Sequence, residues 1–243
     1  MSKNILKEVL ENSKTYPKGY GVLKRLALIR TKAPSNVIGG VLAKKVQDFL
    51  DTLPVNWENE SETYMSALRT LETGKAHCLE GAFVAALVFW MHDQIPYIMD
   101  LKSSNGDDHI VALYKVNGMW GAVSKTNHPT LRFRDPVYKN PRELALSYFH
   151  EYIHLKTGEK ILVSYSDPID LRKIIKPRTK LRTKNNLEWI DDEKDLFWLA
   201  DMIDGWKHNP IYPKKNKAYL RRADHMELKA GNMIEWKKTD KGV

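Results

Sequence analysis

Between Leu79 and Phe89 the chain is apolar on almost every side and rich in alanine and leucine. A helix of this composition has no polar face to present to water, so it lies in the centre of a domain. The run is too short to cross a bilayer. The sequence therefore predicts a fold assembled around one buried helix, and the only cysteine of the chain, Cys78, falls in its first turn.

The position of Cys78 at the start of this helix has a chemical meaning. The free amide groups of a helix start and the positive end of its dipole favour the thiolate over the thiol. A thiolate at this position would act as a nucleophile. The alternative interpretation is that Cys78 is a small buried hydrophobic residue, as a lone cysteine often is.

A β-hairpin is predicted after this helix. The dipeptide Asn117-Gly118 is the strongest short-range hairpin signal, and it separates two strand-like segments, Ile110–Val116 and Met119–Ser124. A two-residue turn sets residue 116 opposite residue 119 and so fixes the register of the whole pair. Another strand is predicted before the hairpin, over Tyr97–Leu101.

His109 opens the first strand of this hairpin. In the predicted register it faces Thr126 directly and Ser124 diagonally, on one face of the sheet. A cysteine at a helix start, a histidine at the head of a strand and a polar group on the next strand form a nucleophile, a base and a group that orients the base. The alternative is an exposed histidine at a strand end, beside Asp107 and Asp108.

These residues carry a resemblance. Cys78 opening a buried helix, His109 at the head of a strand, and the hairpin containing Trp120–Ser124 are similar to the core of the transglutaminase-like superfamily, in its uncharacterised bacterial branch. The match covers about residues 60–127 and extends in bacterial members through Leu131–Tyr138 and on to Tyr152. It implies an α+β, papain-like fold in which the cysteine helix packs on an antiparallel sheet, with additional N- and C-terminal helices.

The resemblance also implies a chemistry. In that superfamily the cysteine attacks an amide or ester carbonyl, the histidine accepts its proton, and an aspartate on the next strand holds the imidazole. Cys78 and His109 match, but the aspartate position falls on Ser124. A serine accepts the imidazole N–H and cannot stabilise an imidazolium by charge. Asn127, Asp108 and Asp135 are therefore kept as alternative orienting groups.

Composition and length bound the organisation of the chain. A chain of 243 residues with 42% hydrophobic content buries one good core. We expect a transglutaminase-like domain with N-terminal helices over residues 1–170, and a basic, aromatic-containing extension packed on or near it over residues 171–243. One cysteine forms no intramolecular disulfide, and the start shows no continuous apolar signal segment, which predicts a soluble cytoplasmic protein without a membrane partner.

The net charge of +9, from 39 Lys and Arg against 30 Asp and Glu, raises the question of nucleic-acid binding. The basic residues form two tracts outside the predicted catalytic core, Arg172–Lys184 and Lys214–Arg222. Lysines interleaved with aromatics bind single-stranded nucleic acid, but such a tail also packs its aromatics and leaves its lysines in solvent. We expect weak nucleic-acid binding at most.

Further helices are predicted from apolar spacing and from start and stop signals. The clearest one starts with Asn140 as cap, Pro141 in the first position and Glu143 in the third, and it runs to Gly158. Short strands are predicted at Leu131–Arg134 and Lys160–Tyr165. The remaining helices are expected over Asn4–Lys14, over Tyr20–Lys32, from about Val41 to near Pro54, over Glu60–Thr73 and within Leu187–Trp206. The last of these is expected to be capped by Asp191 or Asp192 and ended by Gly205.

The helix predicted from Pro141 to Gly158 carries an H-E-x-x-H string at His150, Glu151 and His154. On a helix both histidines lie on one face, able to hold zinc, with the glutamate as general base. No third ligand is obvious in the sequence, and the alternative is a solvated helix face. The string leaves a zinc metallopeptidase as a second hypothesis.

The sequence thus favours a thiol-dependent acyl-transfer enzyme without a cofactor. Cys78 is the nucleophile, His109 the base, and Ser124 or Asn127 orients His109. Hydrolysis of an amide or peptide is preferred over cross-linking because water is the default acceptor. The alternatives are the zinc metallopeptidase and a non-catalytic transglutaminase-like module that binds nucleic acid through the basic tracts. No feature of the sequence selects the substrate.

Overall fold

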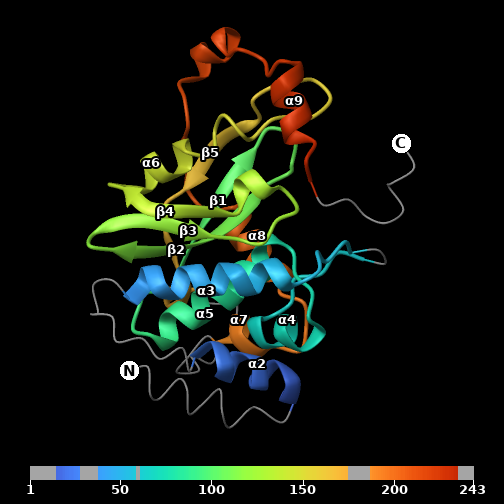
Figure 1. The fold of residues 1–243 in the computed structure, drawn as a ribbon, viewed down its shortest axis with the longest axis vertical. Helices are drawn as coiled ribbons and strands as arrows, with labels where there is room; N and C mark the ends of the chain where they lie inside the picture. The colour runs from blue at the N-terminus through green and yellow to red at the C-terminus, as the bar shows by residue number, and fades with distance from the viewer. Residues whose placement is uncertain (1–14, 28–37, 59–60, 175–186, 235–243) are drawn as a thin grey trace.

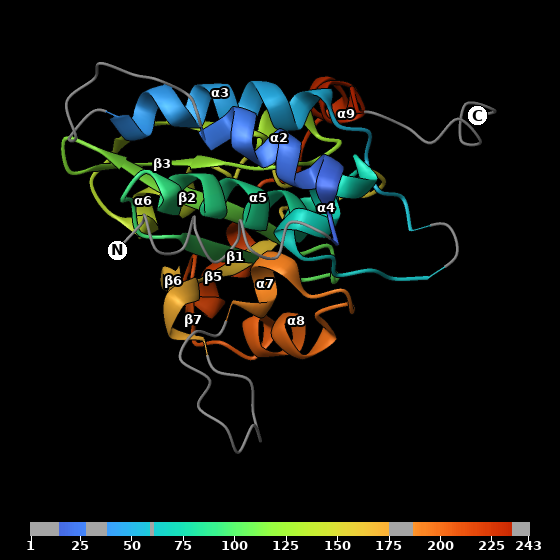
Figure 2. The same ribbon diagram turned by 90° about the horizontal axis from the view of Figure 1, so that it is seen from below.

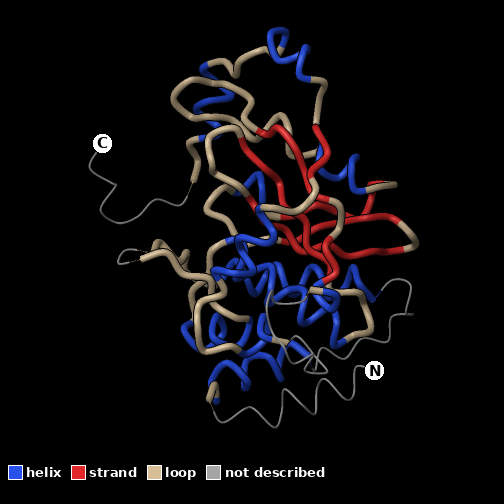
Figure 3. The backbone as a smooth tube through the Cα atoms, turned by 180° about the vertical axis from the view of Figure 1, so that it is seen from behind, coloured by secondary structure: helices blue, strands red, loops and turns tan. Residues whose placement is uncertain are grey.

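The structure is a computed structural model that describes residues 15–27, 38–58, 61–174 and 187–234 (Figure 1). The fold is α+β, with helices packed on a seven-stranded antiparallel sheet of order β4-β3-β2-β1-β5-β7, in which β6 also pairs with β1. Figure 3 shows the strands together, with most of the helical turns gathered below them. The strands are β1 Tyr97–Ser103, β2 His109–Val116, β3 Met119–Val123, β4 Phe133–Tyr138, β5 Leu162–Ser166, β6 Ile169–Asp170 and β7 His208–Pro210.

Helix α5, Cys78–Met91, is the centre of the fold, which confirms the prediction of a buried helix. Every residue from Leu79 to Phe89 is buried. The helix contacts β2 and β1 of the sheet, and other helices pack around the rest of it (Figure 2). These neighbours are α2 Pro17–Ala27, α3 Ile38–Thr52, α4 Ala67–Thr73 and α7 Glu188–Asp191.

The sheet has a different core on each face because successive side chains of a strand point to opposite sides. Ile110, Ala112 and Tyr114 of β2 join the cluster around α5. Val111 and Leu113 of the same strand join a second cluster, which is closed by α6, Pro141–Leu146, and the residues after it. Both faces of the sheet are therefore covered.

The β2–β3 hairpin has the predicted register, from Val116 opposite Met119 to Ala112 opposite Val123. Asn117 and Gly118 have φ of 49° and 81°, the left-handed values that a two-residue hairpin turn requires. The ladder ends at Val123, so the direct pair expected between His109 and Thr126 lies beyond it. Ser124 is the first residue after β3.

The helix predicted from Pro141 to Gly158 is wrong in its length. Asn140 caps it as expected, by accepting a hydrogen bond from the N–H of Glu143 at 2.9 Å, but α6 ends at Leu146. Arg134 binds the end of the helix, donating to Ser147 Oγ at 2.8 Å and to Ser147 O at 3.2 Å. The chain then turns, and Ile161 N–H donates to Tyr152 O at 3.0 Å. Tertiary contacts of this segment override its helical spacing.

The helix predicted within Leu187–Trp206 ends at Gly205 as expected, but its start is wrong, because two helices stand in this segment and the cap of the second is neither Asp191 nor Asp192. They are α7 and α8, the latter spanning Phe197–Asp204. The break is held by residues of the loop before α4: Leu196 N–H donates to Tyr64 O at 2.9 Å, and Asp195 Oδ1 accepts from Tyr64 N–H at 2.9 Å. The segment between α7 and α8 is therefore tied to a segment that is distant in the sequence.

Smaller differences concern helix and strand ends. α2 begins at Pro17 and not at Tyr20, since proline suits the first helical position. α4 begins later than predicted, at Ala67, and ends at Thr73 as expected, with Gly74 as its C-cap at a φ of 72°. A 3-10 helix, Pro129–Leu131, occupies the start of the predicted Leu131–Arg134 strand. The predicted helix Asn4–Lys14 and most of the first basic tract lie outside the described residues.

Residues after 170 add to the same sheet and core. β7 pairs with β5 at one edge of the sheet, and Trp189 of α7 packs against α5. Two 3-10 helices, Leu171–Lys173 and Lys214–Tyr219, and helix α9, His225–Gly231, complete the described structure. The domain boundary at residue 170 stays a prediction. None of the helices in the described ranges is both long and apolar enough to cross a membrane.

Candidate active site

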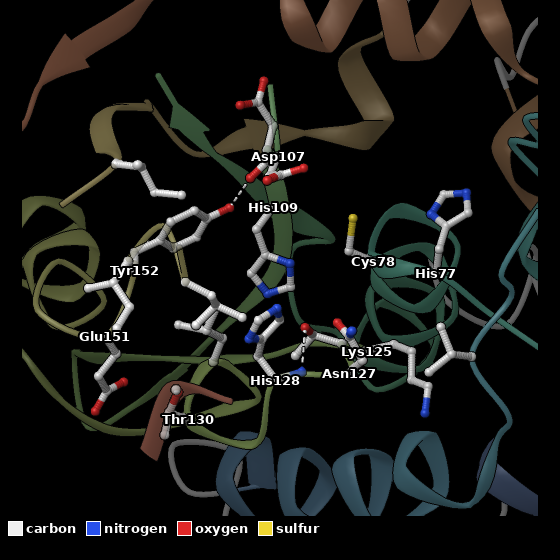
Figure 4. Close-up of a pocket in the computed structure, with 18 of the residues that line it drawn as sticks. His77, Cys78, Asp107, His109, Lys125, Asn127, His128, Thr130, Glu151 and Tyr152 are labelled. Atoms are coloured by element: carbon white, nitrogen blue, oxygen red, sulfur yellow. Dashed lines mark hydrogen bonds between the residues drawn. The ribbon is translucent and has the colours of Figure 1, made fainter. Parts of the chain in front are cut away.

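A cleft of about 740 Å³ opens at the start of α5 (Figure 4). It brings together the head of β2, the loop after β3, the loop before α4 and the segment that follows α6. Cys78 and His109, which the sequence predicts as nucleophile and base, both line it. The other residues used below that line the cleft are Asn56, Glu58, His77, Asp107, Asp108, Lys125, Thr126, Asn127, His128, Glu151, Tyr152 and His154.

The residues around Cys78 fix where α5 begins. His77 is the N-cap in an extended conformation, and its Nδ1 accepts a hydrogen bond from Leu79 N–H at 3.2 Å. Glu80 Oε2 accepts from His77 N–H at 3.0 Å, which completes a capping box. Cys78 is consequently the first helical residue, and its half-buried side chain faces the cleft.

Glu80 ties the cleft wall to the start of α5. Its side chain is 0% exposed, so its carboxylate needs internal partners. It accepts from Thr63 Oγ1 at 3.0 Å, from Met65 N–H at 3.1 Å and from Asn56 Nδ2 at 3.2 Å. Sequence reasoning missed this residue, although a single acid inside an apolar helix was a visible signal.

Ser124 sets the tautomer of His109. Nε2 of His109 lies 3.1 Å from Ser124 Oγ, which is also 3.0 Å from Leu131 O and 2.9 Å from Arg132 O. The hydroxyl has one hydrogen, which it donates to one of these carbonyls, so it accepts from His109 Nε2–H. Nδ1 of His109 is thereby left as the ring nitrogen able to take a proton from Cys78, which lines the same cleft.

The loop that carries Ser124 is itself held in place from α3. Gln47 Oε1 accepts from Ser124 N–H at 3.1 Å, and Gln47 Nε2 donates to Ser124 O at 3.0 Å. The loop also passes close to α5, because a Cβ on Gly81 would lie 2.6 Å from Lys125 Cβ. Gln47 and Gly81 thus position the orienting group, and sequence reasoning identified neither.

The electrostatics of the site favour a thiolate. Burial raises the pKa of Cys78, but hydrogen bonds to His109 and His77 and the charges of both rings outweigh it and lower the pKa to about 5. For His77, burial lowers the pKa, but its hydrogen bond to Cys78 and the negative charges of Cys78 and Glu80 outweigh burial and raise the pKa to about 9. The cysteine therefore loses its proton below neutral pH.

The alternative orienting groups lie elsewhere. Asp108 Oδ1 accepts from Ser103 N–H at 2.7 Å, and Asp135 is exposed on β4. Asn127 lines the cleft beside His128 (Figure 4). Of the predicted orienting groups, Ser124 is the one whose hydroxyl is hydrogen-bonded to His109 Nε2 in the contacts described above.

The H-E-x-x-H string does not form the helix that the zinc hypothesis requires. Its residues lie in the turn after α6, and Glu151 Oε2 accepts from Arg134 Nη2 at 2.6 Å. Within the described ranges, no three or more His, Cys, Asp and Glu side chains come together as a metal site. Glu151 and His154 instead line the cleft together with Cys78.

Tyr152, in the middle of this string, has a structural partner across the cleft. Its hydroxyl donates to Asp107 O, in the loop just before β2 (Figure 4). Burial, and after it the negative charge of Cys78, raise the pKa of Tyr152 well above its usual value, so the phenol keeps its proton. The segment after α6 is thereby tied to the start of the strand that carries His109.

The basic tracts are partly neutralised where the structure describes them. Arg172 pairs with Asp170 at 2.6 Å, and Arg222 with Glu159 at 2.8 Å. Arg221 pairs with Asp224 and Glu227. Lys214, Lys215 and Lys217 are exposed. Nucleic-acid binding stays a prediction.

No protein-family profile matches the chain, and a search of curated proteins gives no significant match. The assignment of a function consequently depends on the geometry of the cleft.

Proposed function

We propose that this protein is a thiol-dependent acyl-transfer enzyme of transglutaminase-like type that hydrolyses an amide or peptide. The observation that supports this proposal is that Cys78, at the start of α5, and His109, held at Nε2 by Ser124, line the same 740 Å³ cleft. A buried cysteine helix packed on an antiparallel strand that begins with the histidine is the arrangement that the resemblance implies.

The reaction begins with the thiolate of Cys78. Its sulfur attacks the substrate carbonyl carbon, and the carbonyl oxygen takes up the negative charge. The backbone N–H groups and the positive dipole end of the 14-residue helix α5 stabilise this charge. The C–N bond then breaks, and the departing amine takes the proton that the thiol had given to His109. A thioester on Cys78 remains.

Hydrolysis of the thioester completes the cycle. His109 Nδ1 takes a proton from a water molecule, and the water oxygen adds to the carbonyl carbon. The C–S bond breaks, the carboxylic acid leaves, and Cys78 returns as a thiolate. Ser124 keeps Nε2 of His109 protonated throughout, so that proton transfer takes place at Nδ1.

The first test is the rate of Cys78 alkylation by iodoacetamide as a function of pH, in the wild type and in His109→Ala. We expect the wild-type rate to titrate far below the free-thiol value of about 8.5, and the variant to titrate at higher pH. A wild-type Cys78 that is inert, or that reacts as an ordinary thiol, would overturn the proposal.

The second test is turnover. Amide and peptide libraries are incubated with the wild type and with Cys78→Ala, and thioester formation on the protein is followed by mass spectrometry. We expect release of amine and an acylated Cys78 in the wild type alone. Product formation that survives Cys78→Ala would contradict the proposed nucleophile.

A further inference from the structure

Trp57 differs from the other tryptophans of the described ranges in where its side chain lies. The others belong to one of the two core clusters or pack against it: Trp90, Trp189, Trp198 and Trp206 around α5, and Trp120 on the opposite face of the sheet. Trp57 belongs to neither cluster, and its half-buried side chain lines the cleft that contains Cys78. A tryptophan that lines a cleft and not a core contacts what the cleft binds.

The backbone brings Trp57 close to Cys78. Val55 forms a parallel bridge with Ala76, in which Asn56 N–H donates to Ala76 O at 3.0 Å. Trp57 lies two residues after this bridge on one segment, and Cys78 lies two residues after it on the other. Because neighbouring residues of a parallel pair advance together, the bridge carries both side chains to the same end of the cleft.

The side chains of this segment alternate, as they do along any extended backbone. Val55 and Trp57 are half-buried and line the cleft. Asn56, between them, is 3% exposed, and its Nδ2 donates to Glu80 Oε2 at 3.2 Å. The polar residue thus fastens the segment to α5, and the two apolar residues form a wall of the cleft.

Thr63 holds the chain on both sides of Trp57. Glu58 has a φ of 51°, a left-handed value that is uncommon for glutamate and persists where the surroundings hold it. Its Oε1 accepts from Thr63 N–H at 2.7 Å, and Asn56 Nδ2 donates to Thr63 Oγ1 at 2.8 Å. Thr63 O in turn lies 2.7 Å from His77 Nε2, at the start of α5. Trp57 is therefore fixed in the wall before a substrate arrives, which lowers the cost of binding.

Trp57 stands on the side of Cys78 that faces away from His109. Figure 4 shows His109 on one side of Cys78 and His77 on the other. The segment of Trp57 adjoins His77, because Glu58 Oε1 lies 3.7 Å from His77 Nε2. In the proposed reaction the departing amine takes its proton from His109, so the amine lies on the His109 side. The acyl part of the substrate then extends toward Trp57.

We propose that Trp57 binds the acyl side of the substrate and that this side carries an aromatic group. The inference depends on the proposed function and names the acyl group that the site prefers. An indole face binds another ring by burying apolar area and by offset or edge-on contact. Val55 extends the same apolar wall, and the cleft volume of about 740 Å³ lies within the range of about 300–1,000 Å³ that ligand sites have.

The test compares two esters that share a leaving group, 4-nitrophenyl acetate and 4-nitrophenyl 3-phenylpropanoate. Acylation of Cys78 is followed by the release of nitrophenolate, with the rate of Cys78→Ala subtracted and each ester normalised to its reaction with glutathione. We expect the wild type to prefer the phenylpropanoyl ester by about threefold to tenfold, Trp57→Phe to keep most of this preference, and Trp57→Ala to lose it. Alkylation by iodoacetamide against pH is the control and should be the same in all three proteins.

A second measurement depends neither on acylation nor on Trp57→Ala. In Cys78→Ala, the indole N–H signal of Trp57 is assigned in ¹⁵N NMR by its loss when Trp57→Phe is added. This signal should shift with 3-phenylpropanamide and not with acetamide. An ester preference of Trp57→Ala within twofold of that of the wild type, or a Trp57 signal that does not respond to 3-phenylpropanamide, would overturn the inference. The proposed function fails separately, if neither ester acylates Cys78 of the wild type.

Discussion

Replacing Ser124 with alanine tests whether a neutral hydroxyl is sufficient to position the base. The side chain is 0% exposed, and its oxygen is the acceptor for His109 Nε2–H. Removing the hydroxyl leaves the Nε2–H group of His109 without its acceptor in a buried site. Leaving a buried polar group unsatisfied costs about 1–3 kcal/mol, so we expect a loss of that size in the free energy of unfolding.

The functional effect follows from the loss of orientation. Without Ser124 Oγ the imidazole rotates away from the sulfur, and a misplacement of about 1 Å costs on the order of 10²-fold in rate. The pKa of Cys78 rises at the same time, because its hydrogen bond to His109 weakens. We therefore expect alkylation at pH 6 and amide turnover to fall together, the latter by about 10²-fold.

A matched control is available in the same loop. Thr126→Ala also removes a cleft-lining hydroxyl, one that accepts from His128 N–H at 3.1 Å. Chemical denaturation, alkylation at pH 6 and turnover are measured for both variants. If Ser124→Ala is as stable as Thr126→Ala and its Cys78 reacts within about twofold of the control, the hydroxyl does not position His109.

Three further predictions concern the groups that build the site. Gly81→Ala should destabilise the protein by about 1–3 kcal/mol, because the new Cβ would lie 2.6 Å from Lys125 Cβ. Gly21→Ala in α2, whose new Cβ would have nothing within 4 Å, should stabilise it by about 0.5–1 kcal/mol. Urea denaturation of both variants measures the difference. Glu80→Gln should cost about 3–5 kcal/mol, because an amide NH₂ would face the donors of Thr63 and Met65, and an unchanged denaturation midpoint would contradict this. Burial raises the pKa of Asp100 to about 6, despite its 3.0 Å contact with His208. As the pH rises, Asp100 therefore loses its proton at a lower pH in the unfolded state than in the folded state. The contribution of protonated Asp100 to the free energy of unfolding is complete below about pH 3.8 and is lost as the pH rises to about 6, by at most about 1.4 kcal/mol per pH unit. This pH dependence should be absent in Asp100→Asn.

The sequence was sufficient for those parts of the site that depend on local rules. A helix apolar all round is buried wherever it occurs, and the Asn117-Gly118 turn sets the hairpin register without help from the rest of the chain. Together they place Cys78 at a helix start and His109 within reach of Ser124. The contact between His109 and Ser124 required only this register.

The parts that could not be predicted depend on contacts between distant segments. The segment after Leu146 has helical spacing, but Arg134 binds its first turn and Tyr152 reaches Asp107 instead. The break between α7 and α8 likewise depends on Tyr64, far away in the sequence. Periodicity describes which side of a segment is apolar, and it contains no information about the partner that competes for its backbone.

The groups that hold the site were nevertheless visible as exceptions to the apolar pattern. Gln47 lies on the buried face of α3, one turn from Ala43 and from Leu50, and Glu80 interrupts the apolar run of α5. A polar side chain in such a position is costly to bury unless distant groups satisfy it. Gln47 is satisfied by the backbone of Ser124, and Glu80 by His77, Thr63 and Met65. Each one therefore marks a segment that must be brought to the core helices: the segment held by Gln47 carries the hydroxyl that bonds His109, and the segment held by Glu80 lies beside His77 at the start of α5. Polar residues at core-facing positions therefore indicate the site independently of the cysteine.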